Sequence, residues 1–222
     1  MPKRPAMTTS LPVRVTFHGY WHCGAGAAAV GDLDAVAIRS EEGLPFVPGR
    51  TLKGVFREAV SLLEENGLVA GGAAKALFGE QGFAFDEDGA WTPTGPTQAG
   101  CLAFSDCRLD ATIRAWFANA LAQELHAAAA HAAAMFDVVA RTAIDAETGT
   151  AADGSLRLIE CAVPLSLEGT VDWAPDPYGD AATAADWQGR WRDALTQAAI
   201  LVRGIGADRT RGLGRCTVKV GA

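Results

Sequence analysis

Hydrophobic and polar residues alternate near the start of the chain, where Val13, Val15 and Phe17 are separated by polar side chains. This period of two predicts a half-buried strand over residues 11–21. Farther along, apolar residues recur every three or four positions from residue 51 until Gly67. That longer period predicts a helix over residues 51–66 with one broad buried face.

The same two periods predict five further elements: a short strand over 101–106, an alanine-rich helix over 110–135, a strand pattern over 155–171 interrupted by Pro164, a helix over 187–202, and a final strand over 216–220. Reduced to its core, this order is β-α-β-β-α-β, which is typical of the ferredoxin-like α+β fold. We expect a flexible tail over 1–10 and a single domain over 11–222, with long insertions. These insertions cover about 23–49, 79–100 and 107–156.

Composition excludes several classes of protein. Almost half of the 222 residues are apolar (49%), enough for one sizeable core, yet no apolar run approaches the length of a membrane span. The first ten residues contain no apolar stretch of the kind a secretory signal needs. Five cysteines without a CxxC pair disfavour a disulfide framework and a zinc knuckle. We therefore expect reduced thiols, a cytoplasmic protein and no membrane partner.

The net charge of −7 is distributed unevenly along the chain. Residues 145–190 carry nine acidic residues against two arginines, and the remainder is balanced. Residues 203–219 are locally basic, with five Arg or Lys residues against Asp208. The charge pattern is that of a dipole, which is compatible with binding a polyanion on one face.

The locally basic segment contains a loop at 204–215 that is rich in glycine and arginine. Its glycines are Gly204, Gly206, Gly212 and Gly214, and its arginines are Arg209, Arg211 and Arg215. Glycine permits positive φ and close approach of the backbone, while arginine matches the oxygens of a phosphate. The loop therefore favours phosphate binding, with a flexible solvated turn as the alternative.

A second basic group opens the helix expected after residue 50. Arg50, Lys53 and Arg57 recur at helical spacing along one side, near a helix N-terminus that attracts anions. Thr51 is a candidate cap for this helix. Gly54 inside the helix costs about 1 kcal/mol relative to alanine, which predicts close approach of another element or of a nucleic-acid backbone. An ordinary solvated helix face is the alternative.

Three side chains between the first strand and this helix are candidates for chemistry. His22 is a general base, an RNA contact or a polar residue at a strand end. Asp32 and Asp34 place two carboxylates in an exposed loop, where such a pair ligates Mg²⁺ through water, polarises a ribose 2′-OH, or simply forms a turn.

Taken in order, these segments resemble the RAMP superfamily of CRISPR-associated proteins, specifically the Csm/Cmr-type backbone subunits of type III effector complexes. The matching segments are residues 21–26 (WHCGAG), 34–39 (DAVAIR), 44–54 (LPFVPGRTLKG), 102–106 (LAFSD), 143–149 (AIDAETG) and the glycine-rich loop at 204–214. They cover both ends and the middle of the chain, and their combined order is specific.

The resemblance implies an RRM-like ferredoxin core that polymerises head to tail along a guide RNA, with a thumb hairpin placed in residues 141–170. It implies that Asp34, with Asp32 as the nearby alternative, cleaves target RNA with a transient Mg²⁺ or Mn²⁺ ion held at Asp34. The RNA-binding positions it implies, together with neighbouring candidates, are His22, Arg50, Lys53, Arg57, Arg141, Gly206, Arg209, Arg211, Gly212, Gly214 and Arg215. The expected partners are guide RNA, target RNA, copies of the chain and other CRISPR effector subunits, as part of antiviral defence.

Two other functions stay open. Ala35 and Val36 stand where the family has Ser or Asn and Pro, so a non-catalytic RNA-binding scaffold is the first alternative. A guide-processing endoribonuclease acting through His22 is the second. If the acidic block at 145–190 faces the basic loop of a neighbouring copy, salt weakens head-to-tail assembly.

Overall fold

A computed structural model describes residues 10–26, 33–85, 90–93, 95, 97–176 and 179–221. Its centre is a four-stranded sheet in the order β10-β1-β9-β6, in which every neighbouring pair is antiparallel. The strands are β1 (Ser10–Phe17), β6 (Leu102–Phe104), β9 (Ser166–Trp173) and β10 (Cys216–Val220). The expected combination of helices with antiparallel strands is confirmed, and the final strand has the predicted bounds.

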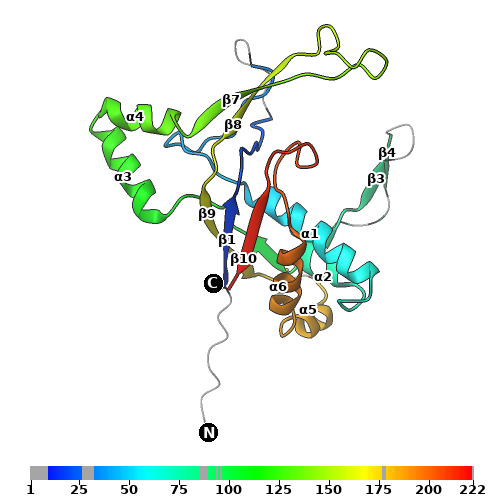
Figure 1. Ribbon diagram of the computed structural model, residues 1–222. Coiled ribbons are helices and arrows are strands. Elements are labelled where there is room, and N and C mark those ends of the chain that lie inside the picture. Colours follow the sequence, from blue (N-terminus) through cyan, green and yellow to red (C-terminus); the bar gives the residue numbers. More distant parts are fainter. Residues whose placement is uncertain are drawn as a thin grey trace.

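Helices cover one face of this sheet. Figure 1 shows α1 (Gly49–Glu65), α5 (Ala181–Trp187) and α6 (Trp191–Leu201) together on one side, with the short α2 (Ala73–Phe78) beside them. On β1, the inward residues from Leu11 to Phe17 are buried and alternate with exposed or half-buried ones. They share one buried core with Leu52 and Phe56 of α1 and Leu195 of α6, all fully buried. This burial of apolar area stabilises the helices against the sheet.

A long hairpin projects from one end of the sheet (Figure 1). It consists of β7 (Phe136–Arg141) and β8 (Arg157–Ala162), which pair from Phe136–Ala162 to Arg141–Arg157. The segment at 34–37 lies along the free edge of β8, where Ala35 bridges Ile159. Two small pairs of strands, β2 (Gly79–Glu80) with β5 (Gln98–Ala99) and β3 (Phe83–Phe85) with β4 (Trp91–Pro93), lie in the expected insertion at 79–100.

The alanine-rich insertion differs from the expectation of one helix over 110–135. It forms α3 (Ala111–Ala122) and α4 (His126–Ala133), on the side of the sheet opposite α1 (Figure 1). The break falls at Glu124, whose positive φ of 54° reverses the chain. The reversal lets Phe117 and Ala120 of α3 and Ala128 of α4 be buried, which one straight helix would not allow.

The other helices also differ in detail from their predictions. The helix expected over 187–202 begins later than predicted, as α6 at Trp191, and Trp187 is instead the last residue of a separate helix, α5. Helix α1 starts at Gly49, and Thr51 does not cap it. Instead the Gly49 N–H donates to Asp106 Oδ1 (2.9 Å), so a distant carboxylate satisfies the helix start.

The five cysteines are buried free thiols. Burial raises the pKa of Cys23 to about 12, so it is a core residue rather than a nucleophile. Among the residues that the structure describes, no helix is long and apolar enough to cross a membrane.

Candidate nucleic-acid interface

The glycine-rich loop at 204–215 is fastened to the chain that follows β1. The Ala207 N–H donates to the His22 carbonyl oxygen and the Gly214 N–H to that of Tyr20, both at 2.8 Å. Ile205 is fully buried and anchors the loop from below. The loop is therefore a fixed structure in the free protein, which corrects the alternative of a flexible turn.

Two glycines make this close fit possible. Gly206 has a φ of +100° and Gly214 a φ of +70°, conformations that side chains rarely adopt. A Cβ at Gly206 would lie 3.1 Å from the His22 carbonyl carbon, and one at Gly214 would lie 3.1 Å from that of Ile205. Gly212 is different, because its φ is +92° but nothing lies within 4 Å of its Cβ position. The first two glycines are needed for packing, and the third only for the turn.

The loop, the start of α1 and the segment after β1 border an open cavity of about 430 Å³. Its lining brings together residues that are far apart in the sequence: Cys23, Gly24, Pro48, Arg50, Thr51, Gly54, Val55, Glu58, Gly206, Ala207 and Arg209. Gly54 is exposed in this cavity, and none of the described atoms lies within 4 Å of its Cβ position. The prediction that another element packs on Gly54 is therefore wrong for the described chain, while close approach of a nucleic-acid backbone stays a prediction.

Among the described residues, no acidic side chain lies within ion-pair distance of the basic side chains of α1, although the charge of Arg50 helps to lower the pKa of Asp106. Arg50, Lys53 and Arg57 take part in none of the ion pairs between described residues. Partial burial and the charge of Arg57 lower the pKa of Lys53. A phosphate placed here would supply the missing negative charge.

The loop arginines differ from one another. Arg209 donates twice to the Glu58 carboxylate, at 2.7 and 3.0 Å, across the wall of the cavity. Arg211 is 78% exposed and 3.9 Å from Asp208. Arg215 is exposed and has no ion pair with any described residue. Arg211 and Arg215 are thus available to a ligand, whereas Arg209 must break its ion pair with Glu58 before it can bind one.

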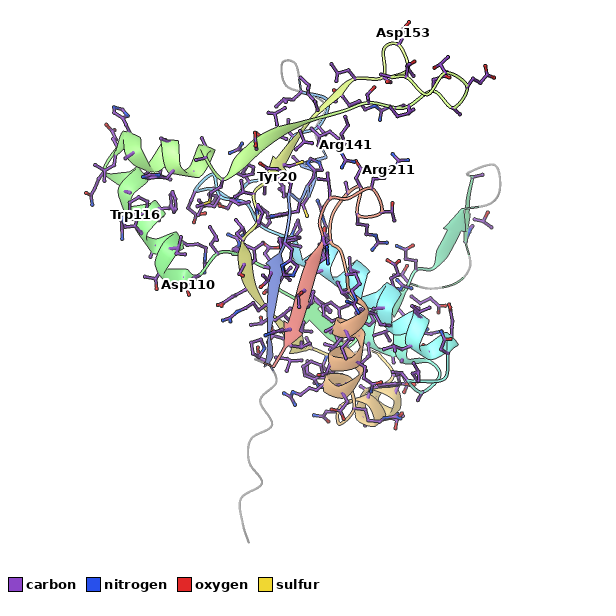
Figure 2. The ribbon with its side chains drawn as sticks, in the orientation of Figure 1. Tyr20, Asp110, Trp116, Arg141, Asp153 and Arg211 are labelled. Atoms are coloured by element: carbon purple, nitrogen blue, oxygen red, sulfur yellow. The ribbon has the colours of Figure 1, made fainter. Side chains whose placement is uncertain are left out.

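Arg141 joins the β7–β8 hairpin to the loop rather than facing solvent. Its guanidinium donates to Asp208 Oδ2 (3.2 Å) and to the Arg211 carbonyl oxygen (3.0 Å). Asp208 has a positive φ of 54°, which is uncommon outside glycine, so this ion pair helps to hold a strained position. Arg141 lies at the end of the β7–β8 ladder farthest from the sheet, and Figure 2 shows it beside Arg211 of the loop.

His22 immediately precedes Cys23 and Gly24 of the cavity lining and is 5% exposed. Its Nδ1 lies 2.6 Å from the Glu160 carbonyl oxygen. Because a carbonyl only accepts, Nδ1 carries the hydrogen, and in the neutral ring Nε2 is an acceptor. Nε2 faces Gly24, 3.2 Å from its Cβ position, so a side chain there would cover it.

Asp34 is exposed beside the hairpin, on the edge of β8. Its Oδ2 accepts the Leu158 N–H (2.7 Å), and its own N–H donates to the Leu158 carbonyl oxygen (2.9 Å). The carboxylate is therefore fixed in direction, with its second oxygen uncommitted to any described residue. Asp32 lies outside the described residues. Within those residues, no group of three or more His, Cys, Asp or Glu side chains could hold a metal.

Sequence reasoning did not identify Glu160, which organises the base of the hairpin. Its carboxylate accepts from Arg39 Nη2 (2.6 Å) and from the Ala37 N–H (3.1 Å) and is 12% exposed. This holds the Asp34–Arg39 segment against β8. Arg39 is 121 residues away, so no local pattern in the sequence signals the pair.

Comparison with known proteins gives a family and a fold. The family model for the RAMP superfamily matches residues 14–217. Curated proteins give no match. Among solved structures, a chain of the type III-B Cmr-beta complex bound to cognate target RNA aligns with a TM-score of 0.61 at 12% identity, covering 95% of this chain and 96% of that one.

Two further structures are similar. A chain of the same type III-B complex in its apo state gives a TM-score of 0.58 at 13% identity, over 95% of this chain and 96% of that one. A chain of a type IV-B CRISPR complex gives a TM-score of 0.56 at 14% identity, covering 96% of this chain and 90% of that one. At these identities, the likeness concerns the fold alone.

Proposed function

Because the chain belongs to the RAMP superfamily, we propose that it is an RNA-binding subunit of a CRISPR effector complex of the type III kind. The observation that carries this proposal is the cavity between the terminal loop and α1, whose lining joins glycine backbone to two arginines: Arg50, which forms no ion pair with a described residue, and Arg209, which is paired with Glu58. Single-stranded RNA needs such a positive groove along its phosphates. Almost the whole chain aligns with a subunit of comparable length from a complex that binds target RNA.

The strand order supports the more specific fold assignment. In chain order, β1, α1, β6, β9, α6 and β10 are the elements of a ferredoxin-like core, and the sheet order β10-β1-β9-β6 suits that topology. We assign the projecting β7–β8 hairpin as the thumb. It begins at Phe136, five residues before the expected segment, and its tip lies within that segment.

In the proposed complex, guide RNA lies along the cavity. Arg50, Lys53 and Arg57 meet phosphates from α1, and Arg211 and Arg215 meet them from the loop. His22 contributes through Nε2, and Gly54 leaves space for the backbone of the RNA. Arg209 joins when phosphate replaces Glu58 as its partner.

Head-to-tail assembly with further copies is part of the proposal. Among the described residues, acidic residues of the 145–190 block form ion pairs within the chain at Glu160 with Arg39, Glu168 with Arg14, and Asp186 with Arg190. Glu147 and Asp153, near the hairpin tip, are the candidates to meet a basic loop of the next copy. Raising the salt concentration should then weaken assembly.

Cleavage of target RNA by Asp34 is the finer part of the proposal. Mg²⁺ in phosphoryl-transfer sites is held by one or two carboxylates together with phosphate oxygens of the substrate. Asp34 alone is too few ligands for a resident metal site, so the described residues do not form one by themselves. What they do provide is a carboxylate fixed by Leu158 beside the hairpin, where it can contact an RNA strand that crosses the hairpin base.

The binding proposal is tested by co-expressing the full chain with guide RNA and sizing the purified product. A multimer with a high ratio of absorbance at 260 to 280 nm is expected. Arg50→Ala should reduce the bound RNA, while Lys219→Ala removes an exposed charge on β10 and serves as the matched control. A monomer free of RNA, or equal losses in both variants, would contradict the assignment of the groove.

Cleavage is tested in the assembled complex with labelled target RNA. Asp34→Asn keeps an acceptor for the Leu158 N–H, so the loop should stay in place while cutting stops and binding persists. Cutting at full rate by Asp34→Asn would remove Asp34 as the residue responsible. Intact target in the wild-type complex across Mg²⁺ and Mn²⁺ titrations would establish the non-catalytic scaffold. Cleavage of repeat RNA by the free chain in EDTA would favour the His22 endoribonuclease.

A further inference from the structure

Tyr20 occupies the junction between the hairpin and the terminal loop. Its carbonyl oxygen accepts the Gly214 N–H (2.8 Å), and its hydroxyl donates to Asp137 Oδ2 on β7 (2.8 Å). One residue thus contacts both elements that the proposed function assigns to RNA. In Figure 2, Tyr20 lies near the base of the hairpin, below Arg141.

The ring of Tyr20 is fixed but not covered. It is 39% exposed and stacks on no other aromatic ring among the described residues. The hydrogen bond to Asp137 raises the pKa of the Tyr20 hydroxyl, so it stays a donor at neutral pH. An aromatic ring held at both ends loses little conformational entropy when a ligand packs on it.

The neighbouring aromatic residue has a different role. Trp21 is 1% exposed, stacks on Phe17 with ring centres 4.3 Å apart, and donates its indole N–H to the Val163 carbonyl oxygen. Every contact of Trp21 is therefore with the core. Successive residues of an extended segment point to opposite sides, so Tyr20 is directed to the outer side.

The loop that is hydrogen-bonded to Tyr20 carries positive charge. Arg211 is 78% exposed, and Arg215 follows Gly214, the residue bonded to the Tyr20 carbonyl. Sites for single-stranded nucleic acid combine two features: cations that follow the phosphates and an aromatic ring on which a base stacks. The junction contains both.

We propose that Tyr20 is a stacking platform for one nucleobase of an RNA strand whose phosphates lie along the terminal loop. This rests on the proposed RNA-binding function and adds a base-contacting residue to it. Since every base has a π-face, the contact is tolerant of sequence. It fixes the position of one base at the foot of the hairpin.

The test uses the full-length chain and uridine-rich single-stranded RNAs, each with 2-aminopurine at one position. Stacking of a base is worth enough that Tyr20→Leu should raise Kd about ten-fold. It should also abolish the quenching of one 2-aminopurine position. Tyr20→Phe keeps the ring and loses only the bond to Asp137, so Kd should stay within about three-fold of wild type, with quenching retained. Trp116→Leu, at a 50% exposed ring on α3, should change neither quantity.

Three results would overturn the proposal. The first is wild-type affinity and quenching in Tyr20→Leu. The second is an equal loss in Tyr20→Phe and Tyr20→Leu, which would mean that Tyr20 only braces the hairpin through Asp137. The third is an equal loss in Trp116→Leu. Failure of the wild-type chain to bind any of the RNAs would instead refute the proposed function itself, so the two failures are distinguishable.

Discussion

Replacing Gly206 by alanine should displace the terminal loop from the rest of the chain. The new Cβ would lie less than 3.0 Å from the His22 carbonyl oxygen and 3.1 Å from its carbon. Both atoms belong to the backbone of a segment that pairs with β8, so they cannot rotate away. The φ of +100° adds strain that any side chain meets. The loop must shift, and the hydrogen bond from Ala207 to His22 is lost.

The magnitude follows from these two terms. Strain at a position with positive φ costs about 1–3 kcal/mol, and the lost hydrogen bond about 1 kcal/mol. If the whole fold carries this cost of about 2–4 kcal/mol, Tm falls by roughly 4–16 °C for a chain of this size. If the loop instead detaches alone, Tm falls less and the loss appears in RNA affinity, because Arg209, Arg211 and Arg215 move with the loop.

Thermal unfolding by circular dichroism and fluorescence anisotropy with single-stranded RNA measure these two quantities. Gly212→Ala is the matched control, because it introduces strain at a φ of +92° without any atom within 4 Å. It should cost less than Gly206→Ala on at least one of the two readouts. If Gly206→Ala unfolds within 1 °C of wild type and binds RNA with the same Kd, the loop is not held as described.

Three further predictions test the same surface. Gly54→Ala should stabilise α1 by about 1 kcal/mol and so raise Tm, yet it should weaken RNA binding, because the added methyl group fills space in the cavity. A rise in both Tm and RNA affinity would contradict the role of Gly54. Arg141→Gln should lower RNA affinity clearly while changing Tm little, and Asp208→Asn should lower the affinity by a similar amount, because the two side chains form one ion pair. If the losses of affinity add up in the double variant, the two residues do not act through this ion pair. Partial burial opposes ionisation of Asp106, but the hydrogen bonds from Arg108 and the Gly49 N–H outweigh burial and lower the pKa of this carboxyl. The ionised carboxylate therefore stabilises the fold above about pH 4, and this stabilisation is lost as the pH falls below that value. The Tm difference between wild type and Asp106→Asn should narrow as the pH falls through about 4.

Elements with a buried and an exposed face could be predicted from the sequence, and elements without that contrast could not. The final strand and α1 each alternate between core and solvent, and both were identified to within two residues. Strand β7 was missed because it has no fully buried residue in the projecting hairpin. The break between α3 and α4 was missed because alanine favours helix throughout and provides no periodic face whose end marks a boundary.

The candidate site divides in the same way. The glycine-rich segments could be recognised from the sequence as places where two stretches of backbone approach each other closely. The structure brings three of them, the terminal loop, Gly24 and the start of α1, to one cavity. The pairing of charges could not be predicted. Arg209 and Glu58 are 151 residues apart, and Arg141 and Asp208 are 67 apart. Only the tertiary fold determines which arginines are neutralised within the chain.

The pairing of some arginines with acidic residues of the same chain helps to explain how an acidic protein of net charge −7 can bind RNA. Paired arginines such as Arg141 and Arg209 shape the loop, whereas Arg50, Lys53, Arg57 and Arg215 have no described acidic partner, and Arg211 is largely exposed. Each phosphate contact to a single strand contributes about 0.7 to the slope of log Kobs against log salt, so these five cations predict a slope of about −3 to −4. Glu58→Gln should steepen the slope by releasing Arg209. An unchanged slope in Glu58→Gln would mean that Arg209 does not contact phosphate, and that its pairing with Glu58 serves the fold alone.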